Sequence, residues 1–119
     1  MKLEELKVYQ ISMDLADEVH DLVTQWDHFY KYSTAQQLLD AADSISANIS
    51  EGFGRFHFKD HKNFLYFSRG SLFETKTWLT KAYRRNLITE EKFNELIEKY
   101  NSLGIKLNNY INSIGPKNS

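Results

Sequence analysis

Residues 44–55 read SISANISEGFGR and mark the end of one helix and the approach to the next. Ile45 and Ile49 stand four residues apart, which places both on one helical face. Gly52 and Gly54 follow at once, and glycine adopts left-handed backbone angles at no steric cost. We therefore predict that a helix with a buried stripe ends at these glycines. They do not form a phosphate-binding loop, because they follow a helix and no lysine–serine pair comes after them.

The same helical periodicity of apolar residues extends in both directions from this stretch. It predicts helices over residues 4–27, 33–52, 58–86 and 89–114, the last of them capped by Thr89. The one proline, Pro116, lies outside all four segments, so no helix is broken internally. Because the connections are short, neighbouring helices should be antiparallel. We predict an all-α, up-down-up-down four-helix bundle that forms a single domain over residues 1–119.

Composition excludes several classes of protein. The chain has no cysteine, which removes disulfides, thiolate zinc sites and cysteine nucleophiles. Residues 1–6 read MKLEEL, which is acidic where a secretory signal would be apolar. No apolar run approaches the roughly 20 residues of a membrane helix. We therefore expect a cytoplasmic protein with no membrane partner.

The net charge of −1 conceals an uneven distribution. Residues 1–52 hold 3 Lys/Arg against 10 Asp/Glu, a net charge of −7, whereas residues 53–87 hold 8 against 2, a net charge of +6. Within the segment 58–86 the cations share one face with aromatic residues, about 100° wide at helical geometry. We name this set the basic face: Lys59, Lys62, Tyr66, Arg69, Phe73, Lys76, Thr80 and Arg84.

Three interpretations of the basic face remain open. It is a subunit contact, because the first helix presents the complementary carboxylates Asp14, Asp17, Glu18 and Asp21 to a neighbouring copy. It is a nucleic-acid surface, because cations neutralise phosphates and aromatic rings stack on unpaired bases. It is a solvated face without a partner. The overall acidic balance counts against tight nucleic-acid binding, since long-range attraction follows the summed field.

No constellation of residues predicts catalysis. His57 and His61 have the spacing of two metal ligands, but the HExxH glutamate is absent and Lys59 and Lys62 would repel a cation. We therefore expect no enzyme activity, no catalytic residue, no metal and no cofactor.

Two further expectations concern the packing of polar and small residues. Asn48, Ser71 and Glu74 are predicted to form a polar network in the bundle. The small residues Ser68, Gly70 and Ser71 are predicted to let a neighbouring helix approach closely.

Four strings of the sequence resemble a known family. They are Leu6-Lys-Val-Tyr-Gln10, Asn48-Ile-Ser-Glu-Gly-Phe-Gly-Arg55, Phe64-Leu-Tyr66 and Gly70-Ser-Leu-Phe-Glu-Thr75. Over residues 5–113 the chain is similar to the four-helix bundle proteins encoded in intervening sequences of bacterial 23S rRNA genes. That family includes the accessory subunit of diversity-generating retroelements. The resemblance implies a structural role for these motif residues: Asn48, Glu51, Gly52, Gly54, Arg55, Gly70, Ser71 and Glu74.

The resemblance also implies ring-like homopentamers, and it implies that some members bind RNA or DNA as accessory proteins, including partners of a reverse transcriptase. This chain has Leu39-Asp40 where the family often has a basic pair, and Ser46 where members commonly carry proline. It also lacks the strongly basic charge of retroelement members. The predicted function is a non-enzymatic oligomeric adaptor or scaffold, a pentamer associated with RNA or a ribonucleoprotein. The alternative is a direct RNA- or DNA-binding accessory module that uses the basic face.

Overall fold

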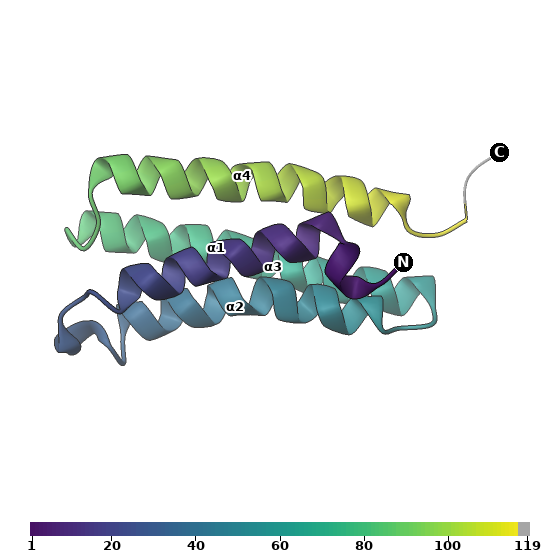
Figure 1. The fold of residues 1–119 in the computed structure, drawn as a ribbon, viewed down its shortest axis with the longest axis horizontal. Helices are drawn as coiled ribbons and strands as arrows, with labels where there is room; N and C mark the ends of the chain where they lie inside the picture. Colours follow the sequence, from purple (N-terminus) through teal and green to yellow (C-terminus); the bar gives the residue numbers. More distant parts are fainter. Residues whose placement is uncertain (117–119) are drawn as a thin grey trace.

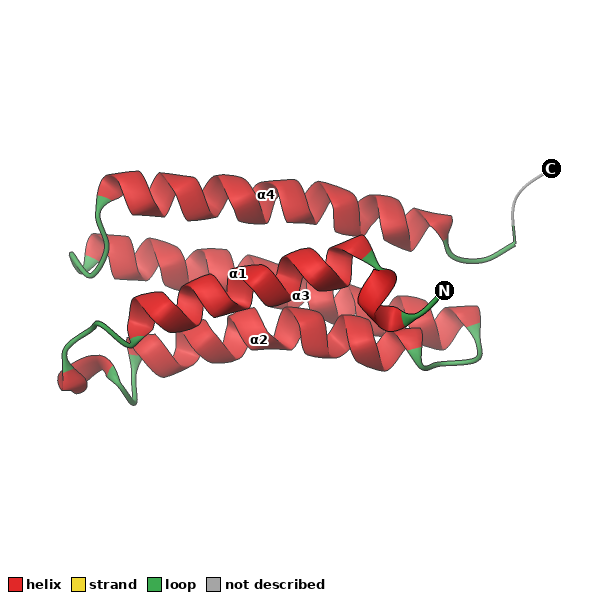
Figure 2. Cartoon of the chain, viewed as in Figure 1, coloured by secondary structure: helices red, strands yellow, loops and turns green. Residues whose placement is uncertain are grey.

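The computed structural model describes residues 1–116, which fold into four long helices and two short 3-10 turns (Figures 1 and 2). The long helices run antiparallel in succession, as predicted for an all-α, up-down-up-down four-helix bundle. Helix α1 packs against α2 and α4, and α3 packs against the same two helices, so α1 and α3 form a diagonal pair. The elements are η1 (Leu3–Glu5), α1 (Lys7–Val23), η2 (His28–Tyr30), α2 (Thr34–Phe53), α3 (Phe58–Arg84) and α4 (Glu90–Ser113).

The helix ends differ from the predicted bounds where the backbone changes direction. Leu6 is extended, with φ −77° and ψ 119°, so it separates η1 from α1 and the first long helix is shorter than 4–27. After α1 ends, Trp26 lies in the connection and packs against the core.

Helix α3 ends at Arg84, two residues before Asn86, whose φ is 61°. The Leu87 amide then donates to the Ala82 carbonyl at 2.9 Å, which satisfies a helix-end acceptor. Thr89 caps α4 as predicted, accepting from the Lys92 amide at 3.1 Å.

Neither glycine at the end of α2 has left-handed backbone angles, so that part of the prediction is wrong, and only Gly52 is required for its small size. Gly54 has φ −78°, and among the described glycines only Gly115 has a positive φ. Gly52 is buried inside α2. A Cβ there would lie 2.9 Å from the His61 carbonyl oxygen and 3.0 Å from the Phe64 Cβ. Gly52 therefore lets the start of α3 approach the end of α2.

The core is formed by apolar residues of all four helices, among them the predicted Ile45 and Ile49 of α2, and contains few polar groups. The Ser68 hydroxyl donates to the Ile45 carbonyl at 2.8 Å, which joins α3 to α2 inside the bundle. Tyr100 is fully buried, and its hydroxyl has no hydrogen-bond partner among the described residues. Burial raises the pKa of the Tyr100 phenol far above its ordinary value, and the carboxylates of Glu18 and Asp43 add to this effect. None of the helices within residues 1–116 combines the length and the hydropathy needed to cross a bilayer.

Candidate functional site on the outer face of helix α3

The predicted basic face lies on the side of α3 that turns away from the core. The buried stripe of the helix contains Leu65, Leu72 and Leu79, whereas the rings of Tyr66 and Phe73 are 44% and 59% exposed. Within residues 1–116, no cation of the basic face forms an ion pair with a carboxylate. All eight residues of the basic face lie within α3, and the seven of them predicted as candidate binding or interface residues are Lys59, Lys62, Tyr66, Arg69, Phe73, Lys76 and Arg84.

Two cations of this face are held beside its aromatic rings. The Arg69 guanidinium lies 5.1 Å from the centroid of the Tyr66 ring, and the Lys76 ammonium lies 5.2 Å from that of Phe73. Cations over aromatic faces gain modest electrostatic stabilisation. Arg69 also donates to the Asn108 side-chain oxygen at 3.1 Å. These neutral contacts leave the positive charges available to a carboxylate or a phosphate.

A groove of about 290 Å³ runs beside the basic face, between α3 and α4. Gly104 packs on Leu72 at this point, since a Cβ on it would lie 3.8 Å from the Leu72 methyl groups. Ile105 stands at the groove with 65% of its surface exposed. The face therefore combines positive charge with an uncovered apolar surface. The lining residues are Arg69, Leu72, Phe73, Lys76, Tyr100, Asn101, Gly104, Ile105 and Asn108.

Two exposed apolar residues of this region were not predicted from the sequence. Phe67 on α3 is 60% exposed, and Ile105 on α4 is 65% exposed. Both fall outside the apolar stripes of their helices, because Leu65 and Leu72 on α3 and Leu103 and Leu107 on α4 are the buried residues. A large apolar residue off the stripe of an amphipathic helix was the available signal.

Gly70 is exposed, and no helix among residues 1–116 approaches it closely, contrary to the prediction that it lets a neighbouring helix approach. No atom lies within 4 Å of a Cβ built on this residue. Ser68 does lie at a helix contact, and Ser71 is half-buried. An exposed glycine in a helix interior costs about 1 kcal/mol relative to alanine. Nothing within residues 1–116 compensates this cost at position 70.

A separate acidic face lies on α1. Asp14, Asp17 and Asp21 are exposed, and within residues 1–116 their one contact with a basic side chain joins the Asp21 carboxylate to the His20 imidazole at 3.5 Å. Glu18 belongs to the predicted set but is engaged within the chain, at 3.0 Å from Lys99 and 3.7 Å from Lys92 of α4. We name Asp14, Asp17 and Asp21 the acidic face.

The negative surface continues from α1 onto α2. Partial burial raises the pKa of Asp43, and the like charges of Asp40 and Asp17 raise it further, against an opposing effect of His20. The carboxylates of the two helices therefore lie close enough to repel one another. This repulsion makes the surface a favourable place for cations from outside the chain.

The motif at the α2–α3 turn is built from structural contacts. Asn48 donates to the Ser44 carbonyl at 2.8 Å, and Arg55 pairs with Glu51 at 2.7 Å one turn apart on the chain. The Arg55 guanidinium lies 4.7 Å from the Phe64 ring centroid, which connects the turn to α3. These contacts hold the corner around Gly52 in place.

His61 continues this corner toward α4. Its imidazole Nε2 lies 3.3 Å from the Tyr110 hydroxyl, and burial lowers the pKa of the imidazole. His57 is exposed at the start of α3. Within the described part of the chain, no three His, Cys, Asp or Glu side chains come together as a metal site would require.

The predicted polar network of Asn48, Ser71 and Glu74 does not form. Asn48 bonds within its own helix, Ser71 is half-buried, and Glu74 is exposed. No hydrogen bond joins the three residues in the described range. Glu74 lies on the outer side of α3, where its carboxylate remains hydrated at no desolvation cost.

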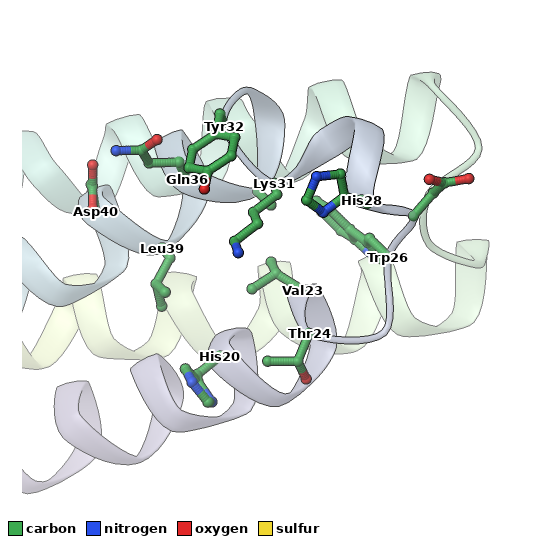
Figure 3. Close-up of a pocket in the computed structure, with 12 residues that line it drawn as sticks. His20, Val23, Thr24, Trp26, His28, Lys31, Tyr32, Gln36, Leu39 and Asp40 are labelled. Carbon is green, nitrogen blue, oxygen red and sulfur yellow. The ribbon is translucent and has the colours of Figure 1, made fainter.

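A cleft of about 560 Å³ separates the end of α1 from the start of α2 (Figure 3). The Lys31 side chain extends into it toward Val23 and Leu39, and Trp26 and Tyr32 contribute aromatic walls. The charged side chains that line the cleft are of both signs, with Lys31 against Asp27 and Asp40. None of the predicted site residues lines it.

Comparisons with known proteins agree with this architecture. Residues 4–109 match the family model of the 23S rRNA-intervening sequence protein. The chain is similar to a crystal structure of a protein of unknown function from the S23 ribosomal protein family of Bacteroides thetaiotaomicron. That similarity has a TM-score of 0.81 and 24% identity, and covers 87% of this chain and 97% of the other. None of the curated proteins compared with the chain matches it.

Proposed function

The chain belongs to the 23S rRNA-intervening sequence protein family, and we propose that it acts as a non-enzymatic homo-oligomeric scaffold or adaptor associated with RNA or a ribonucleoprotein. One observation carries this proposal: the outer side of α3 leaves Tyr66, Phe67 and Phe73 exposed beside unpaired cations. Contiguous exposed apolar surface of this kind marks interaction sites in soluble proteins. We further propose that the assembly is a pentamer, as the family resemblance implies.

A non-enzymatic role is supported by how the reactive side chains are used. Glu51 pairs with Arg55, and His61 is in contact with Tyr110. His57 and His61, whose spacing matched that of two metal ligands, therefore remain in solvent and contribute to the α2–α3 corner, respectively. The protein therefore acts by binding other molecules through its surface.

Replacing the exposed rings tests the assembly. Phe67→Ser combined with Phe73→Ser should reduce the sedimentation coefficient to that of a single chain at micromolar concentration. Losing two aromatic anchors weakens an interface by at least about 2 kcal/mol, or about thirtyfold in Kd. The fold should survive, because both rings lie outside the core. The control is Phe56→Ser, a ring in the α2–α3 connection that is more exposed, at 92%, than either replaced ring. A double variant that sediments like the original assembly would contradict the proposal.

Direct binding of RNA or DNA by the same face is a second candidate function. It is favoured by the geometry of Arg69 and Lys76, each of which lies beside an aromatic ring and has no carboxylate partner within residues 1–116. Such pairs suit single strands, because the ring stacks on a base while the cation meets the phosphate. The charge of the rest of the chain opposes long-range attraction.

Salt dependence measures this second function. We expect Lys62→Glu with Lys76→Glu to weaken binding to a fluorescent single-stranded RNA in an anisotropy titration. Two lost phosphate contacts should also reduce the slope of log K against log salt by about 1.4. Lys7→Glu, an exposed change on α1, serves as the control. Binding that is indifferent to salt and to the double change would dismiss the candidate.

A further inference from the structure

No contact among residues 1–116 explains why a glycine stands at position 70. It lies in the middle of α3, where a glycine weakens the helix, and it is exposed. Its φ is not positive, so no turn requires it, and a Cβ would meet no atom within 4 Å. A residue that is costly and unused in the isolated chain points to a contact outside it.

The surroundings of Gly70 indicate what kind of contact this is. One helical turn separates Gly70 from Tyr66 and Phe67 on one side and from Phe73 on the other. All three rings are exposed. The missing side chain therefore leaves a shallow notch among aromatic rings. The distance between two packed helices depends on the side chains at their contact, so a glycine at this point permits close approach.

Charge complementarity identifies the helix that fits this notch. The acidic face of α1 presents Asp14, Asp17 and Asp21 with no Lys or Arg partner among residues 1–116. Their side chains are short, which suits close packing, and Met13 beside them is 40% exposed. A thioether gains favourable contact with aromatic rings. The cations of the basic face, Lys62, Arg69 and Lys76, supply the opposite charge and outnumber the one carboxylate on this side of α3 near the notch, that of Glu74.

We propose that α1 of a second copy crosses α3 at Gly70, with its acidic face against the basic face. This inference rests on the proposed homo-oligomer and names the two surfaces that form its contact. Because α1 and α3 are diagonal in the bundle, the two surfaces differ and the contact is head-to-tail. Head-to-tail contacts generate closed rings when their rotation closes.

Filling the notch tests the crossing point. Gly70→Gln should raise the dissociation constant of the assembly at least tenfold, while the thermal midpoint of the single chain stays the same or rises because glutamine favours the helix. Ala47→Gln, which adds the same side chain on the exposed side of α2, should leave the mass unchanged. If Gly70→Gln keeps the original mass at the same concentration, the crossing is overturned while the oligomer stands. If the original chain is a monomer, both proposals fall.

Exchanging charges tests the identity of the partner helix. Asp14→Lys with Asp17→Lys, and separately Lys62→Glu with Lys76→Glu, should each weaken self-association. An equimolar mixture of the two variants should form larger species than either alone, because each altered face then meets its complement. These species should be pairs and open chains, because a ring of five cannot close with the two variants alternating. If mixing restores nothing, α1 is not the partner. If Gly70→Gln leaves the mass intact but abolishes binding of single-stranded RNA, the notch serves nucleic acid and the proposal is overturned.

Discussion

Gly52→Ala should lower the free energy of unfolding by roughly 1–3 kcal/mol, the range for overpacking a filled interior. A Cβ at position 52 would lie 2.9 Å from the His61 carbonyl oxygen, which belongs to the backbone of α3. Because backbone cannot rotate out of the way, the start of α3 has to move. The improved helix propensity of alanine offsets only part of this cost. The measurement is urea denaturation at a fixed protein concentration, with the midpoint and the slope both recorded.

Gly54→Ala provides a matched control two residues away. A Cβ at position 54 would have only ordinary contacts, at 3.7 Å from the Glu51 carbonyl oxygen and 3.9 Å from that of Ser50. Its φ of −78° suits any residue, so the unfolding free energy should change by no more than about 0.5 kcal/mol. Equal effects of the two substitutions would show that the close approach of α2 and α3 is not the role of Gly52.

Alkaline pH should destabilise the bundle through Tyr100. Its folded pKa is raised above the ordinary value of 10.0, because burial disfavours the phenolate. The contribution of Tyr100 is fully present below about pH 10, and it is lost as pH rises because the unfolded chain releases the proton first. Where unfolding releases this one proton, the free energy of unfolding falls by about 1.4 kcal/mol for each unit of rising pH. From pH 10 to 12 we expect a loss of about 2–3 kcal/mol from this residue.

Tyr100→Phe isolates that contribution. The variant keeps the ring in the core and removes the ionisable group, so its stability should fall less steeply above pH 10 than that of the original chain. Between pH 7 and 9 the two stability curves should be parallel. Parallel curves above pH 10 as well would mean that the phenol ionises equally in both states, contrary to its burial.

Much of the fold could be predicted from the sequence because the helices are amphipathic and uninterrupted. Ile45 and Ile49 lie in the core, as their spacing predicted, and Thr89 caps α4. The break at Leu6 could not be predicted, since leucine is a good helix former and the extended backbone arises from tertiary packing. The role of Gly52 also depends on the distance to another helix, which no local pattern contains.

The cations of the candidate site could be predicted from the sequence, whereas the residues of other helices that lie beside them could not. Helical periodicity placed Lys62, Arg69 and Lys76 on one face, because that face follows from angles along one helix. Ile105 belongs to another helix, and its place beside the groove depends on how α3 and α4 pack. The polar network with Glu74 failed because the rotation of α3 about its axis exposes that residue.

The mass of the unaltered chain in solution tests the central claim that the outer face of α3 is covered by another copy. Light scattering at micromolar concentration should give about 70 kDa for five chains of 14.0 kDa each. The mass should fall on dilution toward that of one chain, as mass action requires. A mass of 14.0 kDa at every concentration would contradict the account, because the exposed rings would then have no partner of their own kind.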